Sequence, residues 1–442
     1  MKKIELSKII VENNLIRYEV KQEKGLDLLQ EEIVKLFIRF HGNENFNIAL
    51  NELPQSILAL PISLYLLPIT YFYNVELVLP EMDKTLYEKL PEIYAAYSKI
   101  YGPFKNEWRG KLTVGKIVEN SNYGNAKYDK VVFFSGGVDA VSAGINNPGK
   151  KTLLVSIPDI ESQAKNEGPL REEKFSLIKR FSKVVDSDWL LISNNFNAAC
   201  FNDGEINKTL RERLKLNSDA FNFDGWFGIK YLANMCCVAP IAYATGVEKL
   251  VMGSAFEQLE DKISANYDGA NPELSDSIAF AGTRFAEQDE IYTLRSKKTK
   301  NIVDWYNARG KKTKLWTCFS DRSTQCGICT KCLRTQLNIL CANENPKEWG
   351  FDNFSEKTFA RQVCSYRYLE RNACWPWDIF NSIDENITYS YCNDLLHWMK
   401  RLGYKEYLRR AKLRSRVVFV IRCLISIHKY PRYLKKVFQK LV

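Results

Sequence analysis

Apolar and polar positions follow three different patterns along this chain of 442 residues, and each pattern predicts a different kind of structure. In the first 50 residues, strand-like runs at 8–12 and 15–20 alternate with polar turns and lead into an amphipathic stretch through Leu36 and Phe37. Short runs bounded by polar turns are typical of strands, and the longer amphipathic stretch adds a different element. This part is therefore predicted to be a small α+β region.

The second pattern is a stretch of 23 residues without a charge, at 53–75. Its length passes the roughly 18-residue test for a membrane span. However, Pro54, Pro61 and Pro68 remove backbone donors, which a hairpin buried in protein tolerates better than a helix in lipid. We therefore expect a buried helical hairpin, followed by a strand at 75–79 and a helix at 84–100.

The third pattern begins after the polar run 119–127 and repeats an apolar strand, a turn and a helix. Its apolar runs lie at 130–134, 152–157, 189–193 and 249–252. Strands that alternate with helices predict a parallel α/β sheet. From about residue 341 the pattern is mostly helical. We therefore expect an N-terminal α+β region at 1–127, an α/β domain at 128–340 and a helical region at 341–442.

Composition narrows the class of protein. Hydrophobic residues make up 45% of the chain, aromatic residues 13% and charged residues 26%, as in folded globular proteins. The three histidines, His41, His397 and His428, are far apart in the sequence. A Ser-His-Asp triad and a metal centre of several histidines are therefore excluded.

Charge is concentrated in the last 43 residues, where 14 Lys and Arg face a single acid, Glu406. That segment carries a net charge of +13, whereas the whole chain carries +11. The rest of the chain therefore has a net charge of −2 and is nearly neutral. An apolar run at 417–421 lies among the arginines. A basic helix of this kind suits nucleic acid, an anionic membrane or an acidic protein about equally, and a helix docked on its own domain remains an alternative.

The N-terminus favours a cytoplasmic protein, because Glu5 and Lys8 interrupt the apolar stretch that a signal peptide needs. In a reducing compartment the twelve cysteines are expected to be thiols or metal ligands and not disulfides.

A glycine-rich loop follows the first apolar run of the α/β part and consists of Ser135, Gly136, Gly137, Val138 and Asp139. Two glycines let the backbone approach an anion, and the helix that follows directs its positive N-terminus at it. Asp139 could hold Mg²⁺ or cap backbone amides. A plain Gly-Gly turn between a strand and a helix is the structural alternative.

This loop resembles the SGGxDS fingerprint of the PP-loop ATP pyrophosphatases, whose fold is that of the adenine nucleotide alpha hydrolases. The resemblance implies that the chain binds ATP with Mg²⁺ and releases pyrophosphate while it activates a carboxylate or carbonyl as the adenylate. Ala140 stands where the family has serine, and Ser142 follows two residues later. The loop therefore lacks one hydroxyl of the fingerprint.

Four cysteines after Trp316 have the spacing of a metal site: Cys318, Cys326, Cys329 and Cys332. Gly327 allows a tight knuckle, and four thiolates suit a closed tetrahedral zinc site with a structural role. A redox-active CxxC pair and an iron–sulfur cluster are the alternatives.

The two motifs together resemble the 7-cyano-7-deazaguanine synthases, the QueC family, over residues 128–340. The second motif reads W-T-C-F at 316–319 and C-G-I-C-T-K-C-L-R at 326–334. The resemblance implies an AMP-forming ligase that adenylates 7-carboxy-7-deazaguanine and forms an amide and then a nitrile with ammonia.

Further roles follow from this resemblance. Ser156 and Ile157 end the second strand, where the adenine would meet the backbone, and Gly253 and Ser254 would face the reacting carboxylate. Lys297 would neutralise the phosphates in the transition state. Ordinary strand packing and a solvated helix face are the alternatives, and Tyr267 and Asp268 lie in a loop that is either a lid or plain surface.

The chain also departs from that family. Residues 156–161 lack its tyrosine-glycine-glutamine, and long N- and C-terminal segments exceed its usual length. It is more similar to enlarged QueC-like proteins of bacterial anti-phage defence operons, which implies an amine or protein acceptor from an operon partner. A homodimer, a tRNA-modifying PP-loop enzyme (a sulfurtransferase or lysidine-type ligase) and a degenerate nucleotide-binding subunit are kept as alternatives.

Overall fold

The structure is a computed structural model of the whole chain. It describes residues 1–42, 48–102, 104–121, 126–158, 172–214, 218–253, 256–265, 271–287, 294–318, 325–365 and 373–427. The chain forms two compact units. Unit 1 consists of Met1–Glu257 and Ser264–Thr293, and unit 2 consists of Gln258–Ile263 and Leu294–Val442.

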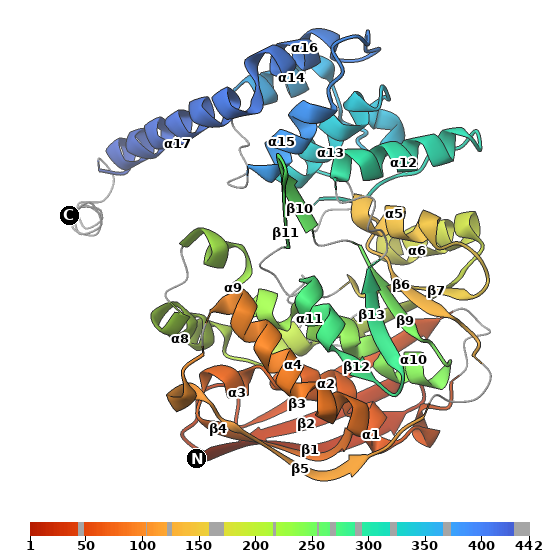
Figure 1. The fold of residues 1–442 in the computed structure, drawn as a ribbon, viewed down its shortest axis with the longest axis vertical. Coiled ribbons are helices and arrows are strands. Elements are labelled where there is room, and N and C mark those ends of the chain that lie inside the picture. The colour runs from red at the N-terminus through yellow and green to blue at the C-terminus, as the bar shows by residue number, and fades with distance from the viewer. Residues whose placement is uncertain are drawn as a thin grey trace. The chain divides into compact units, whose positions relative to one another are not determined.

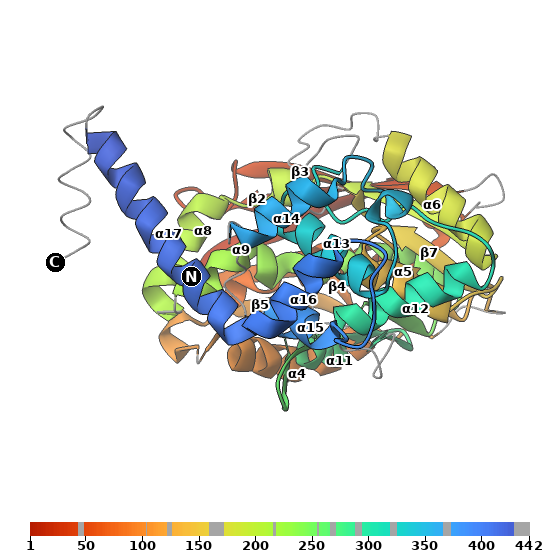
Figure 2. The same cartoon turned by 90° about the horizontal axis from the view of Figure 1, so that it is seen from above.

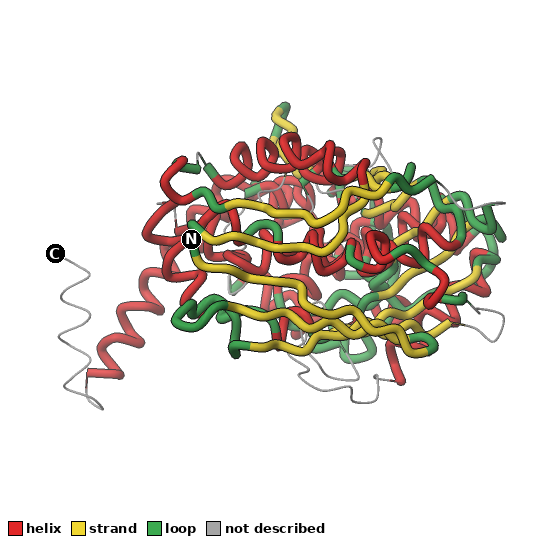
Figure 3. The backbone as a smooth tube through the Cα atoms, turned by 90° about the horizontal axis from the view of Figure 1, so that it is seen from below, coloured by secondary structure: helices red, strands yellow, loops and turns green. Residues whose placement is uncertain are grey.

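Unit 1 is built on one large mixed sheet, visible as the yellow strands of Figure 3. In chain order its strands are β1 Lys2–Glu12, β2 Leu15–Gln22, β3 Ile33–Gly42, β4 Val75–Asp83, β5 Lys111–Val118, β6 Lys130–Phe133, β7 Thr152–Ser156, β8 Asp188–Asn194, β9 Lys249–Met252, β12 Ala279–Phe280 and β13 Thr283–Glu287. Their order across the sheet is β12-β13-β9-β6-β7-β8-β3-β2-β1-β4-β5. A separate hairpin pairs β10 Phe256–Leu259 with β11 Lys262–Ala265.

The sheet is mostly parallel, which confirms the predicted α/β class. Strands β13, β9, β6, β7 and β8 run parallel to one another, as do β1, β4 and β5. The four apolar runs of the repeated pattern form the strands β6, β7, β8 and β9. Each is buried almost throughout, because helices cover parallel strands on both faces.

The N-terminal region belongs to the same sheet as the α/β part. The amphipathic stretch around Leu36 and Phe37 is strand β3, which pairs antiparallel with β8 from Ile38↔Asn194 to Gly42↔Leu190. The boundary predicted near residue 127 therefore lies inside unit 1, where the sheet continues across it.

Helices of unit 1 pack against this sheet (Figure 1). Those of unit 1 are α1 Gln55–Leu58, α2 Leu60–Leu66, α3 Ile69–Phe72, α4 Lys84–Tyr101, α5 Val138–Asn146, α6 Glu172–Val185, α7 Phe196–Ala199, α8 Asp203–Leu214, α9 Ser218–Met235, α10 Ala239–Ala244 and α11 Pro272–Ser277. The uncharged stretch forms the short helices α1–α3, and nearly all of their side chains are buried, as expected. None of the helices in the described part of the chain has the length and apolarity needed to cross a membrane.

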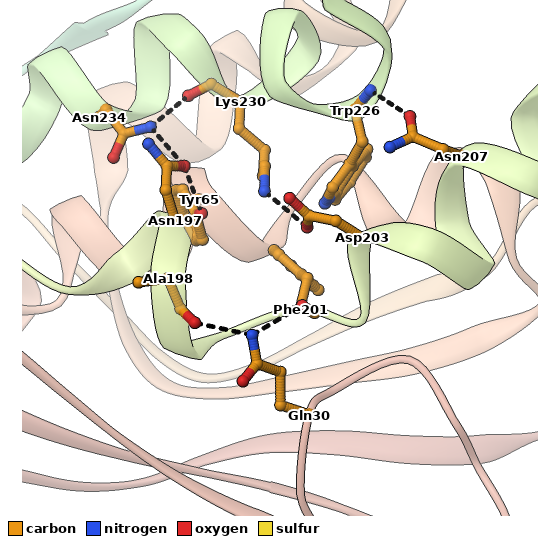
Figure 4. A network of polar contacts seen from close by, with 10 residues as sticks. All are labelled: Gln30, Tyr65, Asn197, Ala198, Phe201, Asp203, Asn207, Trp226, Lys230 and Asn234. Atoms are coloured by element: carbon orange, nitrogen blue, oxygen red, sulfur yellow. Dashed lines mark hydrogen bonds and ion pairs between the residues drawn. The ribbon is translucent and has the colours of Figure 1, made fainter. Parts of the chain in front are cut away.

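A buried polar network links α2, α8 and α9 (Figure 4). Lys230 of α9 is fully buried, and its Nζ lies 2.9 Å from Oδ1 of Asp203. The ammonium also lies 5.4–5.6 Å from the ring centres of Tyr65, Phe201 and Trp226. Three aromatic rings and one carboxylate therefore replace the water that a lysine normally keeps.

The secondary structure of unit 2 in its described residues is helical apart from the tip of the β10–β11 hairpin. Residues 294–340, predicted to belong to the α/β domain, lie not in unit 1 but in this unit. Its helices are α12 Arg295–Asn307, α13 Thr330–Cys341, α14 Glu356–Cys364, α15 Cys374–Ser382, α16 Asn393–Leu402 and α17 Tyr404–Ile427. The helices α12, α13 and α15 contact one another, and α17 contacts α15 and α16.

Candidate functional site

The glycine-rich loop joins β6 to α5 at the carboxyl end of the sheet. Phe134 donates its backbone N–H to the carbonyl of Val155 at 2.7 Å, which extends the pairing with β7 by one residue. The chain then turns at Gly136, whose φ of 83° favours glycine. Gly137 is the N-cap of α5, and no side chain among the described residues caps this helix end. The first amides of α5 are thus left to bind an anion, as a phosphate loop requires.

The loop lies at the topological switch point of the sheet. Strand β6 has β7 on one side and β9 on the other, and all three are parallel. The chain leaves β6 toward β7 and β8 and returns to the other side of β6 as β9. Open α/β sheets bind ligands at the carboxyl ends of the strands where the order reverses in this way.

Gly253, which follows β9, approaches the first turn of α5 very closely. A Cβ atom at this position would lie 2.7 Å from the Cβ of Asp139 and 3.2 Å from its carbonyl carbon. No larger residue fits without moving α5. The structure therefore brings together three sequence-predicted segments: the loop 135–139, the end of β7 at Ser156, and Gly253.

The individual side chains differ in their access to this edge. Ser135 is exposed, and its Oγ accepts a long hydrogen bond of 3.5 Å from the N–H of Gly137. Asp139 is half-buried in the first turn of α5, whereas Ser156 and Ile157 are buried. Ser142 is fully buried, and its hydroxyl has no hydrogen-bond partner in the described residues. It therefore does not supply the hydroxyl that Ala140 lacks.

Other predicted residues are not joined to this edge. Lys297 is exposed in the first turn of α12 and belongs to unit 2, while the loop belongs to unit 1, so its role toward the phosphates stays a prediction. Ser254, Tyr267 and Asp268 lie outside the described residues.

The four predicted cysteines form a cluster in unit 2. The Sγ atoms of Cys318, Cys326, Cys329 and Cys332 all lie within 4.8 Å of one another, and those of Cys326 and Cys332 are 3.9 Å apart. Tetrahedral zinc–sulfur bonds of about 2.3 Å require sulfur atoms about 3.8 Å apart. The cluster can therefore hold a metal ion such as zinc.

Local geometry explains why the sequence folds into this cluster. Gly327 has a φ of 69°, which allows the tight knuckle, and the N–H groups of Cys326 and Cys329 point at the sulfurs of Cys318 and Cys326 at 3.4 and 3.3 Å. Cys329 is the N-cap of α13, and Cys332 lies one turn later and is fully buried.

The buried side-chain amides of two glutamines hydrogen-bond to the backbone around the cluster. Gln336 donates to the carbonyls of Gly327 and Cys332 at 2.9 and 3.1 Å. Gln325 accepts from the N–H of Thr317 at 2.9 Å and donates to the carbonyl of Gly350 at 3.0 Å. Hydrogen bonding to Cys329 and burial raise the pKa of the Cys332 thiol. A bound cation would reverse this effect, because metal ligation favours the thiolate.

A second polar cluster, which the sequence did not reveal, fixes the start of α12. Asp378 is buried and accepts hydrogen bonds from both the N–H and the hydroxyl of Ser296, the first at 3.0 Å. The guanidinium groups of Arg295 and Arg334 lie 4.0 and 3.9 Å from the ring centre of Trp375. Burial raises the pKa of Asp378, although Ser296 and both arginines oppose this. The cluster thereby joins the helix that carries Lys297 to α13 and α15.

Gly253→Ala is expected to destabilise unit 1 by about 1–2 kcal/mol, because the added methyl overlaps Asp139 and forces α5 to move. Thermal unfolding followed by circular dichroism measures the change. Gly204→Ala is the matched control, since the nearest atom to its new Cβ lies 3.7 Å away and alanine favours the helix. Equal stability of the two variants would contradict the close approach.

We compared the chain with models of known protein families, with curated proteins and with solved structures. None of the three comparisons finds a match.

Proposed function

We propose that this chain is an AMP-forming ligase that uses ATP to adenylate a carboxylate and releases pyrophosphate. The observation that carries the proposal is the glycine-rich loop at the switch point between β6 and β9. A left-handed glycine, an uncapped helix N-terminus and a nearby carboxylate are the features that a nucleotide triphosphate with its Mg²⁺ requires.

Each segment of this edge has a role in the proposed reaction. The amides at the start of α5 would bind the pyrophosphate portion of ATP and stabilise its charge as it leaves. Asp139 would hold Mg²⁺, and the backbone at Ser156 would meet the adenine. Gly253 lets the end of β9 pack directly against Asp139, because it has no side chain.

The proposed carboxylate is 7-carboxy-7-deazaguanine or a related acid, on the resemblance of the two motifs to the QueC family. The activated acid would then be passed to ammonia, an amine or a protein. The cysteine cluster would hold Zn²⁺ with a structural role, because four thiolates leave no open position for a substrate.

Asp139→Ala is expected to lower pyrophosphate release from Mg-ATP at least about tenfold, because the variant removes a ligand of the metal that bridges the phosphates. The assay follows pyrophosphate with and without 7-carboxy-7-deazaguanine, and mass spectrometry identifies the product as nitrile, amide or protein conjugate. Asp129→Ala is a matched control, because its carboxylate precedes β6 at the opposite end of the strand.

Release that depends on both the acid and Asp139 would support the proposal. Release that requires tRNA in place of the acid would favour the tRNA-modifying alternative. No release with any substrate would favour the degenerate subunit, for which the buried Ser142 and the missing hydroxyl at Ala140 already give a physical reason.

A further inference from the structure

An open cavity of about 1060 Å³ lies in unit 1 at the end of β3. Its lining comes from the end of β1 and the turn after it, from the end of β3, from residues 48–51, and from α6, β8 and α10. Helix α6 packs against β7 and β8 (Figure 2). The cavity is large enough for a small molecule, and its described lining shares no residue with the loop 135–139, Ser156 or Gly253.

Aromatic rings form one wall of this cavity. Phe175 of α6 lies between His41 of β3 and Trp189 of β8, and its ring centre is 5.7 Å from that of His41 and 6.3 Å from that of Trp189. All three side chains are only partly buried. Partly exposed rings on a cavity wall are a surface on which a planar ligand can stack.

The cavity also carries one positive charge without a counter-charge. Lys179, one turn after Phe175, is the only lysine or arginine among the described residues of the lining, and none of the described carboxylates pairs with it. Its Nζ lies 5.5 and 5.2 Å from the ring centres of Phe175 and Trp189. The acid of the lining, Glu12, instead forms an ion pair with Arg17 at 3.4 Å.

Neutral polar groups complete the lining. Burial and the charge of Arg39 lower the pKa of His41, so its imidazole is neutral at pH 7, and its Nε2 lies 3.3 Å from Oγ of Ser193. Asn13 and Asn51 are exposed, and their side chains form no hydrogen bond with other described residues. A carboxamide both donates and accepts, which matches the edge of a heterocycle.

We propose that this cavity binds a small heteroaromatic anion of the nucleoside monophosphate class. The planar ring would stack on Phe175 and Trp189, and the acidic group would pair with Lys179. Asn13 and Asn51 are the available hydrogen-bonding groups of the lining. This site is separate from the proposed ATP site, and the inference does not depend on the proposed ligase activity.

The charge of the lining argues against two other classes of ligand. A polynucleotide needs several cations for its successive phosphates, whereas the described lining has one. A metal cation needs several oxygen ligands with negative charge, and the described lining has only Glu12, which Arg17 already neutralises. One uncompensated lysine fits a ligand with one acidic group.

The test is isothermal titration calorimetry of the full chain with AMP, GMP, CMP and UMP and with the four matching nucleosides. At least one nucleotide should bind, and its nucleoside should bind at least about tenfold more weakly, because it lacks the phosphate that pairs with Lys179. Lys179→Met should weaken the nucleotide by the same factor and leave the nucleoside unchanged. Lys183→Met is the matched control, since Lys183 is an exposed lysine of α6 outside the lining.

A second pair of variants tests the ring and the place of binding. Phe175→Leu keeps an apolar side chain but removes the ring, so it should weaken both nucleotide and nucleoside at least about fivefold. Asp139→Ala should leave this binding unchanged, because Asp139 does not line the cavity. Failure of the proposed ATP site and failure of this cavity are thereby told apart.

Three results would overturn the proposal. The first is that none of the four nucleotides binds, and the second is equal affinity of the Lys179→Met and Lys183→Met variants for the nucleotide. The third is binding that Asp139→Ala abolishes and Lys179→Met leaves unchanged, which would assign the nucleotide to the glycine-rich loop.

Discussion

Cys332→Ser is expected to abolish metal binding at the cysteine cluster and to unfold the segment around it. Cys332 is fully buried at the start of α13, and a serine oxygen cannot replace its thiolate in a tetrahedral site of four sulfurs. Structural zinc contributes about 10 kcal/mol or more to the folding of small zinc domains, so the loss is large even when the neighbouring helices compensate in part. The purified variant should contain no zinc by elemental mass spectrometry and should be cut by protease within residues 313–341.

Cys364→Ser is the matched control for this prediction. Cys364 is exposed at the end of α14 and lies outside the cluster, so this variant should keep one zinc per chain and resist protease. A brown protein that contains iron would overturn the assignment of zinc and favour the iron–sulfur alternative. A metal-free wild-type chain with an oxidised pair in the cluster would favour the redox alternative.

The strands of the α/β part could be predicted because each is a short apolar run that ends in a polar or glycine-rich turn. Strand β9 has the predicted bounds, and β6 and β7 each end one residue earlier than predicted. Strand β3 has the alternation of a strand, because Val34, Leu36, Ile38 and Phe40 are buried at every second position, and it pairs with the nearby β2. Its pairing with β8 could not be predicted, because it joins residues more than 140 positions apart and has no local pattern. The sequence therefore suggested a separate N-terminal region where the structure has one continuous sheet.

The candidate site, like the fold, could be predicted from the sequence only where a local pattern or the strand topology specifies it. The loop 135–139 and the ends of β7 and β9 could be predicted to share one edge, because parallel strands place their carboxyl ends together. The contact of Asp378 with Ser296 could not be predicted, because the two residues are 82 positions apart and a single aspartate belongs to no repeating pattern. The approach of Gly253 to Asp139 also depends on how α5 lies on the sheet, which no spacing in the sequence specifies.

Lys230 is another residue that the sequence did not single out. It lies on α9, where its side chain is fully buried against three aromatic rings. Its partner Asp203 is 40% exposed, so water still reaches the carboxylate. Removing Asp203 therefore leaves a buried charge without a partner, whereas removing Lys230 leaves a carboxylate that water still reaches.

Asp203→Asn is expected to destabilise unit 1 by about 2–3 kcal/mol at pH 7, because it leaves the Lys230 ammonium buried without a counter-charge. Lys230→Met should cost less than about 1 kcal/mol, since methionine fits among the rings and the half-exposed carboxylate keeps its water. Urea unfolding of wild type and both variants, followed by tryptophan fluorescence, measures the difference. Equal losses in the two variants would contradict the asymmetry of burial.

The pH dependence provides an independent check of the same pair. Burial lowers the pKa of Lys230 from its ordinary value of 10.5, and Asp203 opposes this. In the interval between the lowered pKa and 10.5, the unfolded chain binds a proton that the folded chain has released, so the free energy of unfolding rises with pH. Asp203→Asn lowers the pKa further, and its deficit relative to wild type should therefore shrink as the pH rises from 7 toward 10. Lys230→Met has no ammonium to titrate, so a rise of the same steepness in this variant would show that another group is responsible.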